Sequence, residues 1–176
     1  MKYRIPYGGM MLGRAEINAA MKAIKKNYWP AGPICGKMEE EASKYLGVKY
    51  GILANSGSSA GLLALAALEL PRGSEVIIPA VTFPTIFNII LQCGLVPVVV
   101  DSKIGTYNLD PEELEAAITE KTRAIICVHV LGIPCDMPKI KAWCDLNDLV
   151  LIEDAAHAHG SRINGQHVGV FGDVGT

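Results

Sequence analysis

Residues 149–160 read LVLIEDAAHAHG, an apolar run that ends in two carboxylates and a turn of small residues. The run is short and continuous, which predicts a buried strand with Glu153 and Asp154 at its carboxyl end. Ligands of an open α/β sheet bind outside the carboxyl ends of the strands, so we expect a site at this end. Successive strand residues point to opposite faces, so we expect one carboxylate to face the site and the other to have a structural role.

The rest of the chain repeats this alternation of apolar runs and helical patterns. We predict strands at 50–54, 75–79, 96–100, 122–128 and 149–153, helices at 14–26, 37–45, 59–70, 84–93 and 137–147, and a further helix opened by Asp110. Continuous apolar strands that alternate with helices are typical of a parallel sheet covered on both faces. The predicted fold class is α/β, with a helical segment at 1–48 and a sheet domain at 49–176.

The composition argues against several functional classes. The chain has 176 residues, a hydrophobic fraction of 50% and a net charge of −2, which gives no electrostatic basis for binding nucleic acid or an anionic membrane. The five cysteines form no CxxC pair, the N-terminus resembles no signal peptide, and no apolar run is long enough to cross a bilayer. We therefore expect a soluble, reduced, cytoplasmic protein.

A second candidate element is NSGSSAG at residues 55–61, between a predicted strand and a predicted helix. Gly57 allows a tight turn and Ser58 begins the helix, so unpaired N–H groups at the positive end of the helix dipole would form a phosphate site. A serine-capped helix without a ligand fits these residues equally well. The motif is neither a Walker loop nor GxGxxG, which argues against a nucleoside triphosphate or a dinucleotide.

Asp154 and Phe83 suit a planar cationic cofactor. A carboxylate at a strand end can keep a pyridinium nitrogen protonated, and so keep a pyridoxal ring acting as an electron sink; a helix-capping aspartate is the alternative. The ring of Phe83, just past a strand end, could stack on such a cofactor or belong to the core. The histidines match no zinc spacing, so we expect no metal and assign His157 a hydrogen bond beside the cofactor.

Seven segments in register resemble the DegT/DnrJ/EryC1/StrS family of sugar-nucleotide aminotransferases, which are fold-type-I enzymes that use pyridoxal phosphate. The segments are WPAGP at 29–33, NSGSSA at 55–60, EVIIPAVTF at 75–83, TYNLD at 106–110, VHVLG at 128–132, EDAAHA at 153–158 and FGDVGT at 171–176. The resemblance implies that residues 49–176 belong to the cofactor-binding large domain of that fold, a mostly parallel sheet with helices on both faces.

The resemblance also implies a role for each site residue. Gly57 and Ser58 would hold the cofactor phosphate, Phe83 would stack on the pyridine ring, and Asp154 would pair with the ring nitrogen. His157 occupies a position often held by glutamine, which contacts the ring hydroxyl, and imidazole can donate the same hydrogen bond. The implied catalytic residues of this chain are Asp154 and His157.

One family feature is absent from the sequence. In the family, the lysine that forms the Schiff base follows the FGDVGT segment, and this sequence ends at Thr176, before that position. We therefore expect the chain to be an incomplete N-terminal portion of such an enzyme, without the Schiff-base lysine and without the C-terminal small domain.

The implied reaction moves an amino group, from glutamate, onto a keto group of a nucleotide-linked sugar, in a ping-pong sequence through pyridoxamine phosphate. The expected partners are the nucleotide sugar and the amino donor, and the intact protein is expected to be a homodimer. Two alternatives stay open. A sugar 3-dehydratase of the same family uses pyridoxamine phosphate and carries histidine in place of the lysine, although EDAAHA fits the aminotransferases better. A shortened, non-catalytic paralogue would bind the cofactor or a partner chain.

Overall fold

The computed structural model describes residues 11–26 and 32–176. Its helices are α1 (Arg14–Lys25), α2 (Pro33–Leu46), α3 (Gly57–Ala67), α4 (Pro84–Gln92), α5 (Leu114–Ala117) and α6 (Met137–Leu146), with the 3-10 turns η1 (Pro111–Glu113) and η2 (Val130–Gly132). Its strands are β1 (Glu75–Pro79), β2 (Val96–Val100), β3 (Thr122–Val128), β4 (Val150–Asp154), β5 (Arg162–Ile163), β6 (Gln166–His167) and β7 (Val174–Gly175).

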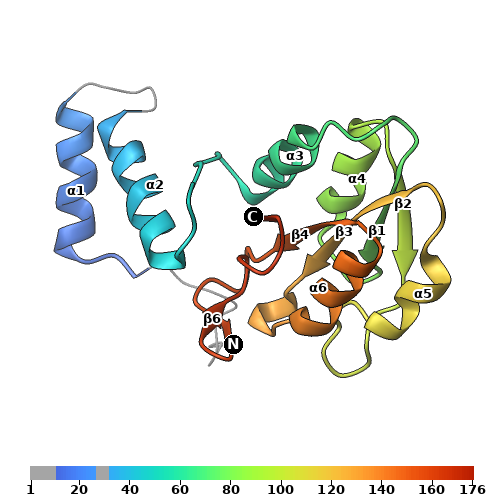
Figure 1. Ribbon diagram of the computed structural model, residues 1–176. Helices are drawn as coiled ribbons and strands as arrows, with labels where there is room; N and C mark the ends of the chain where they lie inside the picture. Colours follow the sequence, from blue (N-terminus) through green and yellow to red (C-terminus); the bar gives the residue numbers. More distant parts are fainter. Residues whose placement is uncertain (1–10, 27–31) are drawn as a thin grey trace, which may run out of the picture.

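Five strands form one sheet in the order β2-β1-β3-β4-β7, and each neighbouring pair in it is parallel (Figure 1). The chain runs from β1 outward to β2 and then crosses back to place β3 on the other side of β1. The carboxyl ends of β1 and β3 therefore flank a topological switch point, where open sheets bind ligands. β5 and β6 form a separate antiparallel hairpin. The predicted α/β class with a mostly parallel sheet is confirmed.

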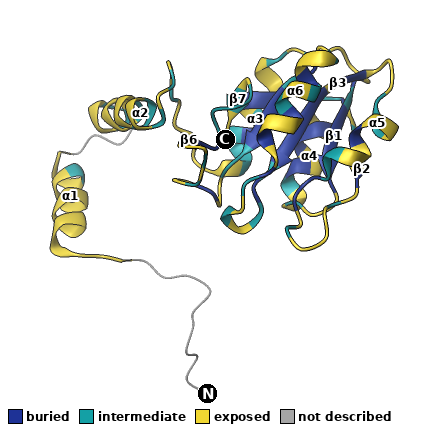
Figure 2. Cartoon of the chain, turned by 60° about the horizontal axis from the view of Figure 1, so that its bottom comes forward, coloured by how far each residue is buried: buried dark blue, intermediate teal, exposed yellow. Residues whose placement is uncertain are grey.

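The two faces of the sheet bury alternate residues of the same strands. Val76 and Ala124 share a core cluster with residues of α3 and α4, whereas Ile77 and Ile125 share one with residues of α5 and α6. Because β1, β3 and β4 are covered on both sides, almost every residue in their middle is apolar. Figure 2 shows the strands as a buried layer between helices that are exposed on their outer surfaces.

α1 and α2 lie beside the sheet and cover neither of its faces (Figures 1 and 2). Neither helix contributes a buried residue. Near the end of α2, the ring of Tyr45 packs on the region of the β5–β6 hairpin, with its centroid 4.6 Å from that of His167 and 5.7 Å from that of His159. This aromatic cluster links α2 to the segment that follows β4.

One expectation from the sequence needs correction. Residues 50–54 form no strand, because they pair with no strand in the described part of the chain, and Tyr50 and Ile52 are 73% and 74% exposed. An apolar pattern alone cannot make a strand when no neighbour pairs its backbone. The helix predicted to open at Asp110 is present: the Asp110 carboxylate accepts the N–H of Glu112 at 3.2 Å, and the helical segment runs through η1 and α5 to Ala117. Most of the WPAGP segment lies outside the described residues.

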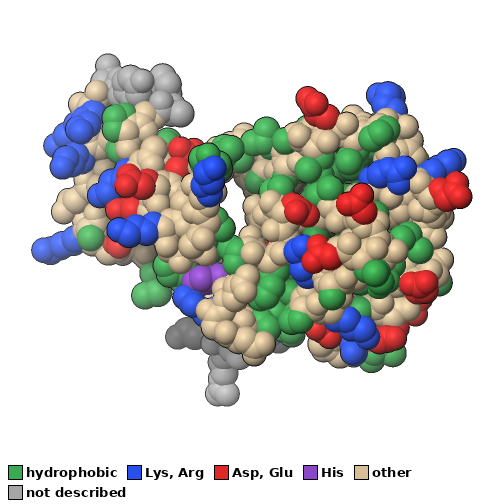
Figure 3. Space-filling model, viewed as in Figure 1, with side chains coloured by type: hydrophobic (Ala, Val, Ile, Leu, Met, Phe, Trp, Pro, Cys, Tyr) green, Lys and Arg blue, Asp and Glu red, His purple; other side chains and the backbone are tan. Residues whose placement is uncertain are grey.

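Charges of both signs are mixed on one face of the molecule. Figure 3 shows lysine, arginine and acidic side chains interspersed on the face in view, without a large patch of one sign. Across residues 11–26 and 32–176, no helix has the length and apolar character needed to span a membrane.

Candidate active site

All the site residues predicted from the sequence line a single cavity of about 390 Å³ at the carboxyl edge of the sheet. Gly57 and Ser58 come from the start of α3, Phe83 from the turn after β1, and Asp154 and His157 from the end of β4 and the turn that follows. Residues 128–131, at the end of β3 and directly after it, complete the wall. The cavity thus stands at the topological switch point, and its volume is in the range of small-molecule sites.

The start of α3 directs backbone N–H groups towards this cavity. Ser56 caps the helix, because its hydroxyl accepts the N–H of Ser59 at 3.1 Å. The N–H groups of Gly57 and Ser58 have no acceptor among the described residues. An anion bound there would accept both and lie at the positive end of the helix dipole. A Cβ on Gly57 would approach Ala156 no closer than 3.8 Å, so packing within the chain does not itself require glycine.

Asp154 presents its carboxylate to the cavity. It is the last residue of β4 and is half-buried, and its Oδ1 accepts the N–H of Ala156 at 3.1 Å. A cationic nitrogen of a bound ligand could pair with this carboxylate, which is the chemistry that the sequence predicts for Asp154.

Glu153, the neighbouring carboxylate, is fully buried and does not face the cavity. Its Oε1 accepts the N–H groups of Phe171 and Gly172 at 2.6 and 2.7 Å, and its Oε2 accepts the N–H of Gly169 at 2.9 Å. Burial would raise the pKa of Glu153, but the hydrogen bonds from His129 and these N–H groups hold it below its usual value. The structure therefore shows which of the two carboxylates has the structural role that strand alternation predicts.

Sequence reasoning missed His129, which is 1% exposed and directly follows β3. Its Nδ1 accepts the N–H of Cys135 at 3.1 Å, so the ring proton is on Nε2, which lies 3.1 Å from Oε2 of Glu153. Its backbone N–H donates to the carbonyl oxygen of Asp154 at 3.0 Å. A histidine directly after a predicted strand was the available signal, but strand order was needed to see that this strand pairs with β4.

The walls of the cavity fit a phosphorylated, cationic, planar group. Thr82 has a buried hydroxyl in the lining without a hydrogen-bond partner among the described residues, which leaves it available to a ligand. The ring of Phe83 is 67% exposed, so it does not belong to the core. His157 is exposed in the same lining. Together with the N–H groups of α3 and the Asp154 carboxylate, these residues could hold the phosphate, the ring and the ring nitrogen of pyridoxal phosphate.

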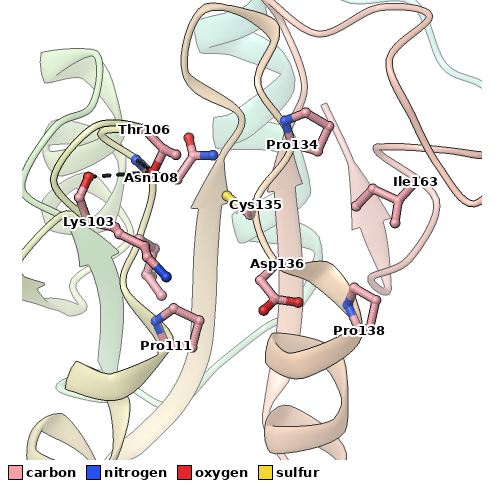
Figure 4. A pocket seen from close by; sticks show the side chains of 10 residues that line it. Lys103, Thr106, Asn108, Pro111, Pro134, Cys135, Asp136, Pro138 and Ile163 are labelled. Carbon is pink, nitrogen blue, oxygen red and sulfur yellow. Dashed lines mark hydrogen bonds between the residues drawn. The ribbon is translucent and has the colours of Figure 1, made fainter.

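A second cavity, of about 320 Å³, lies between the segments before α5 and before α6, and Figure 4 shows its lining. Asn108 in this lining accepts the N–H of Val130 at 3.0 Å and donates to the carbonyl oxygen of Ile133 at 3.0 Å. These bonds hold the η2 turn, in which Leu131 has a left-handed φ of 53° and lines the first cavity. Asn108 therefore sustains a strained backbone at the edge of the candidate active site.

The histidines and cysteines that follow β3 and β4 do not assemble a metal centre in the described ranges, where no three suitable side chains gather. His129 is engaged by Glu153 and Cys135. His167 accepts a hydrogen bond from Arg162, with Nη2 of Arg162 and Nε2 of His167 2.6 Å apart. Each of these rings thus has a hydrogen-bonding role within the protein.

Known proteins resemble this chain in both sequence and fold. The model of the DegT/DnrJ/EryC1/StrS aminotransferase family matches residues 11–176. The lipopolysaccharide biosynthesis protein RfbH of Salmonella typhimurium is 39% identical over 98% of this chain and 41% of that protein. A UDP-N-acetyl-3-dehydro-alpha-D-glucosamine 3-aminotransferase of Acidithiobacillus ferrooxidans is 46% identical over 78% of this chain and 37% of that protein.

Among solved structures, E coli GDP-4-keto-6-deoxy-D-mannose-3-dehydratase with bound hydrated PLP superposes with a TM-score of 0.90, at 32% identity over 95% of this chain and 44% of that one. The predicted fold-type-I architecture is confirmed by this match. The chain spans less than half the length of each of these relatives. The names of the relatives include both an aminotransferase and a 3-dehydratase.

Proposed function

The chain belongs to the DegT/DnrJ/EryC1/StrS aminotransferase family, and from that premise we propose that it forms a pyridoxal phosphate cradle in a sugar-nucleotide aminotransferase. The enzyme would transfer an amino group, from glutamate, to a keto group of a nucleotide-linked sugar. The similarity to a lipopolysaccharide biosynthesis protein supports a place in polysaccharide biosynthesis.

One observation carries the proposal: residues from three separate parts of the chain meet in one cavity with complementary chemistry. The start of α3 offers N–H groups to an anion, Asp154 offers a carboxylate to a cation, and Phe83 offers an exposed ring. If the start of α3 were only a serine-capped helix, or Asp154 only a helix cap, there would be no reason for these three groups to line the same cavity. Their convergence at the switch point supports a cofactor that is anionic at one end and cationic in its ring.

Each residue would do a distinct part of the work. Gly57 and Ser58 bind the phosphate through their N–H groups, and Phe83 orients the ring by stacking. Asp154 keeps the ring nitrogen protonated, and His157 donates a hydrogen bond to the ring hydroxyl. When bound, the cofactor supplies an electron sink, whose strength depends on the charge that Asp154 holds beside it.

The second candidate function is a 3-dehydratase that uses pyridoxamine phosphate. The similarity to a GDP-4-keto-6-deoxy-D-mannose-3-dehydratase favours it, because the two chains superpose over almost all of this one. Against it stands EDAAHA at 153–158, which fits the aminotransferases better. In the natural gene, lysine at the position of the family's anchoring residue would support the aminotransferase, and histidine there would support the dehydratase.

The test uses the complete natural polypeptide and its Asp154→Asn variant, with Asp136→Asn as the control, because Asp136 is an exposed carboxylate that lines the other cavity. We would titrate pyridoxal phosphate by its absorbance and follow amino transfer from glutamate to nucleotide-linked keto sugars by mass spectrometry. We expect Asp154→Asn to slow transfer by about a hundredfold or more and to leave the fold intact. Asp136→Asn should match the wild type.

Each outcome separates the candidates. Near-normal transfer by Asp154→Asn would remove the role assigned to Asp154. Loss of water from the sugar, with pyridoxamine phosphate and without an amino product, would identify the dehydratase. Cofactor binding without either product would identify the non-catalytic paralogue, and no binding by the wild type would refute the cofactor cradle.

A further inference from the structure

The carboxylate of Glu153 is the meeting point of four donors that come from different parts of the chain. Three are backbone N–H groups of the turn at 169–172, and the fourth is Nε2–H of His129. The side chains of Glu153 and His129 are both 0% exposed. A buried carboxylate with all its lone pairs engaged is fixed in position, because any rotation would leave several donors unpaired.

The same two residues also fix the backbone that carries Asp154. The N–H of His129 donates to the carbonyl oxygen of Asp154 at 3.0 Å from the β3 side. From the β7 side, the N–H of Thr176 donates to the carbonyl oxygen of Glu153 at 2.8 Å, and the N–H of Ala155 donates back to Thr176 at 2.8 Å. The end of β4 is therefore hydrogen-bonded to the backbone of the segments on both sides of it, and the side chain of Glu153 fixes it to the turn at 169–172.

The turn at 169–172 can reach Glu153 because glycines let the backbones approach. A Cβ on Gly172 would lie 2.5 Å from the carbonyl oxygen of Leu151, and one on Gly175 would overlap the carbonyl oxygen of Gly169. Gly169 itself has a left-handed φ of 84°. These three glycines therefore allow the turn to bring three N–H donors to a single buried carboxylate.

We propose that His129 and Glu153 are positioning residues, which together hold the end of β4 so that the Asp154 carboxylate keeps its place in the cofactor cavity. His129 connects the end of β3 to β4, because its ring hydrogen-bonds to the side chain of Glu153 and its backbone N–H donates to the carbonyl oxygen of Asp154. The role in the cofactor cavity rests on the proposed function, whereas the hold on the strand end does not.

The experiment compares two replacements of His129 in the complete polypeptide. His129→Leu removes both ring hydrogen bonds with little change in volume, and His129→Gln returns an amide donor that can reach Glu153. Asp173→Asn is the matched control, because the Asp173 carboxylate also binds β4, accepting the N–H of Leu151 at 2.8 Å, but does not contact Glu153. Should His129→Leu fail to fold, His129→Asn keeps an acceptor for Cys135 without reaching Glu153 and carries the same expectation.

Three quantities are measured on each variant. Hydrogen–deuterium exchange of the cofactor-free protein reports the mobility of residues 153–157 and 169–172. Titration with pyridoxal phosphate gives its dissociation constant, and the visible circular dichroism of the bound cofactor reports its orientation. For His129→Leu we expect faster exchange in both segments, a changed dichroic band and about tenfold weaker binding, in line with the loss of a hydrogen bond to a charged group. His129→Gln should recover most of the loss. Asp173→Asn should leave cofactor affinity and dichroism unchanged and should speed local exchange far less than His129→Leu.

A merely structural histidine would give a different pattern. If His129→Leu lowers the melting temperature but leaves local exchange, cofactor affinity and dichroism like those of Asp173→Asn, the positioning role is overturned. If His129→Gln recovers nothing, the Nε2–H donor is not what matters and the proposal is likewise overturned. If the wild type binds no pyridoxal phosphate, the proposed function fails, while the exchange rates still decide whether His129 and Glu153 hold the strand end.

Discussion

Two adjacent residues on β4 have opposite environments. Glu153 lies in the interior with four hydrogen-bond donors, and Asp154 opens into the cavity. We expect Glu153→Gln to lower the free energy of unfolding by about 3 kcal/mol or more, because the amide group would face N–H donors and leave them unpaired. Urea unfolding at neutral pH measures the change. Asp173→Asn weakens one hydrogen bond of an exposed carboxylate and should lower the free energy of unfolding by about 1 kcal/mol. Equal losses in the two variants would contradict the claim that the buried, fully hydrogen-bonded carboxylate of Glu153 contributes more to stability than an exposed one.

The charge of Glu153 also predicts a pH dependence. Its pKa in the folded protein lies below the ordinary value of 4.5, because the hydrogen bonds it accepts outweigh the effect of burial. A carboxyl group with a depressed pKa stabilises the fold at pH values above its unfolded pKa, and this contribution is lost as the pH falls through the folded pKa. The stability difference between wild type and Glu153→Gln should therefore narrow as the pH is lowered from 7 to 3. A difference that stays constant over this range, in unfolding curves at each pH, would contradict the assignment.

At the scale of elements, close backbone contact is as important as the apolar pattern. Gly175 in β7 lies so near the carbonyl oxygen of Gly169 that a methyl group cannot be added without moving the turn at 169–172. We expect Gly175→Ala to lower the free energy of unfolding by about 3 kcal/mol. Gly36 is the control: it lies inside α2 with nothing near its missing Cβ, so Gly36→Ala should raise stability by about 0.5–1 kcal/mol. Thermal unfolding of the two variants gives the comparison, and a neutral Gly175→Ala would show that the turn can relax.

The elements that the sequence predicted correctly are those whose evidence is local. β1, β2 and β3 have the expected bounds because apolar residues occupy nearly every position of these strands, which is the pattern of a parallel sheet. Residues 50–54 have the same local pattern but no neighbour to pair with in the described chain. The cavity residues came from motifs, whereas His129 and Asn108 act through partners more than twenty residues away, which only strand order and register could reveal.

At the scale of the whole molecule, α1 has an apolar stripe that the rest of the described chain does not bury. Ile17, Met21 and Ile24 recur at helical spacing and are 51%, 46% and 51% exposed. The family resemblance implies a homodimer, and a second copy of the chain is the occupant that we propose for this stripe. Light scattering on the complete polypeptide should then give a dimer for the wild type and a monomer for the double variant Ile17→Glu, Met21→Glu.

The control for this prediction uses the opposite side of the same helix. Ala15 and Ala19 lie about 180° from the stripe, since each residue of a helix turns by about 100°. The double variant Ala15→Glu, Ala19→Glu adds the same charge to α1 and should remain dimeric. If the Ile17→Glu, Met21→Glu variant is monomeric but unfolded, the stripe packs within a single polypeptide and not against a second copy. A dimer that persists in that variant would place the subunit contact elsewhere, and either result would refute the role of α1 in dimerisation.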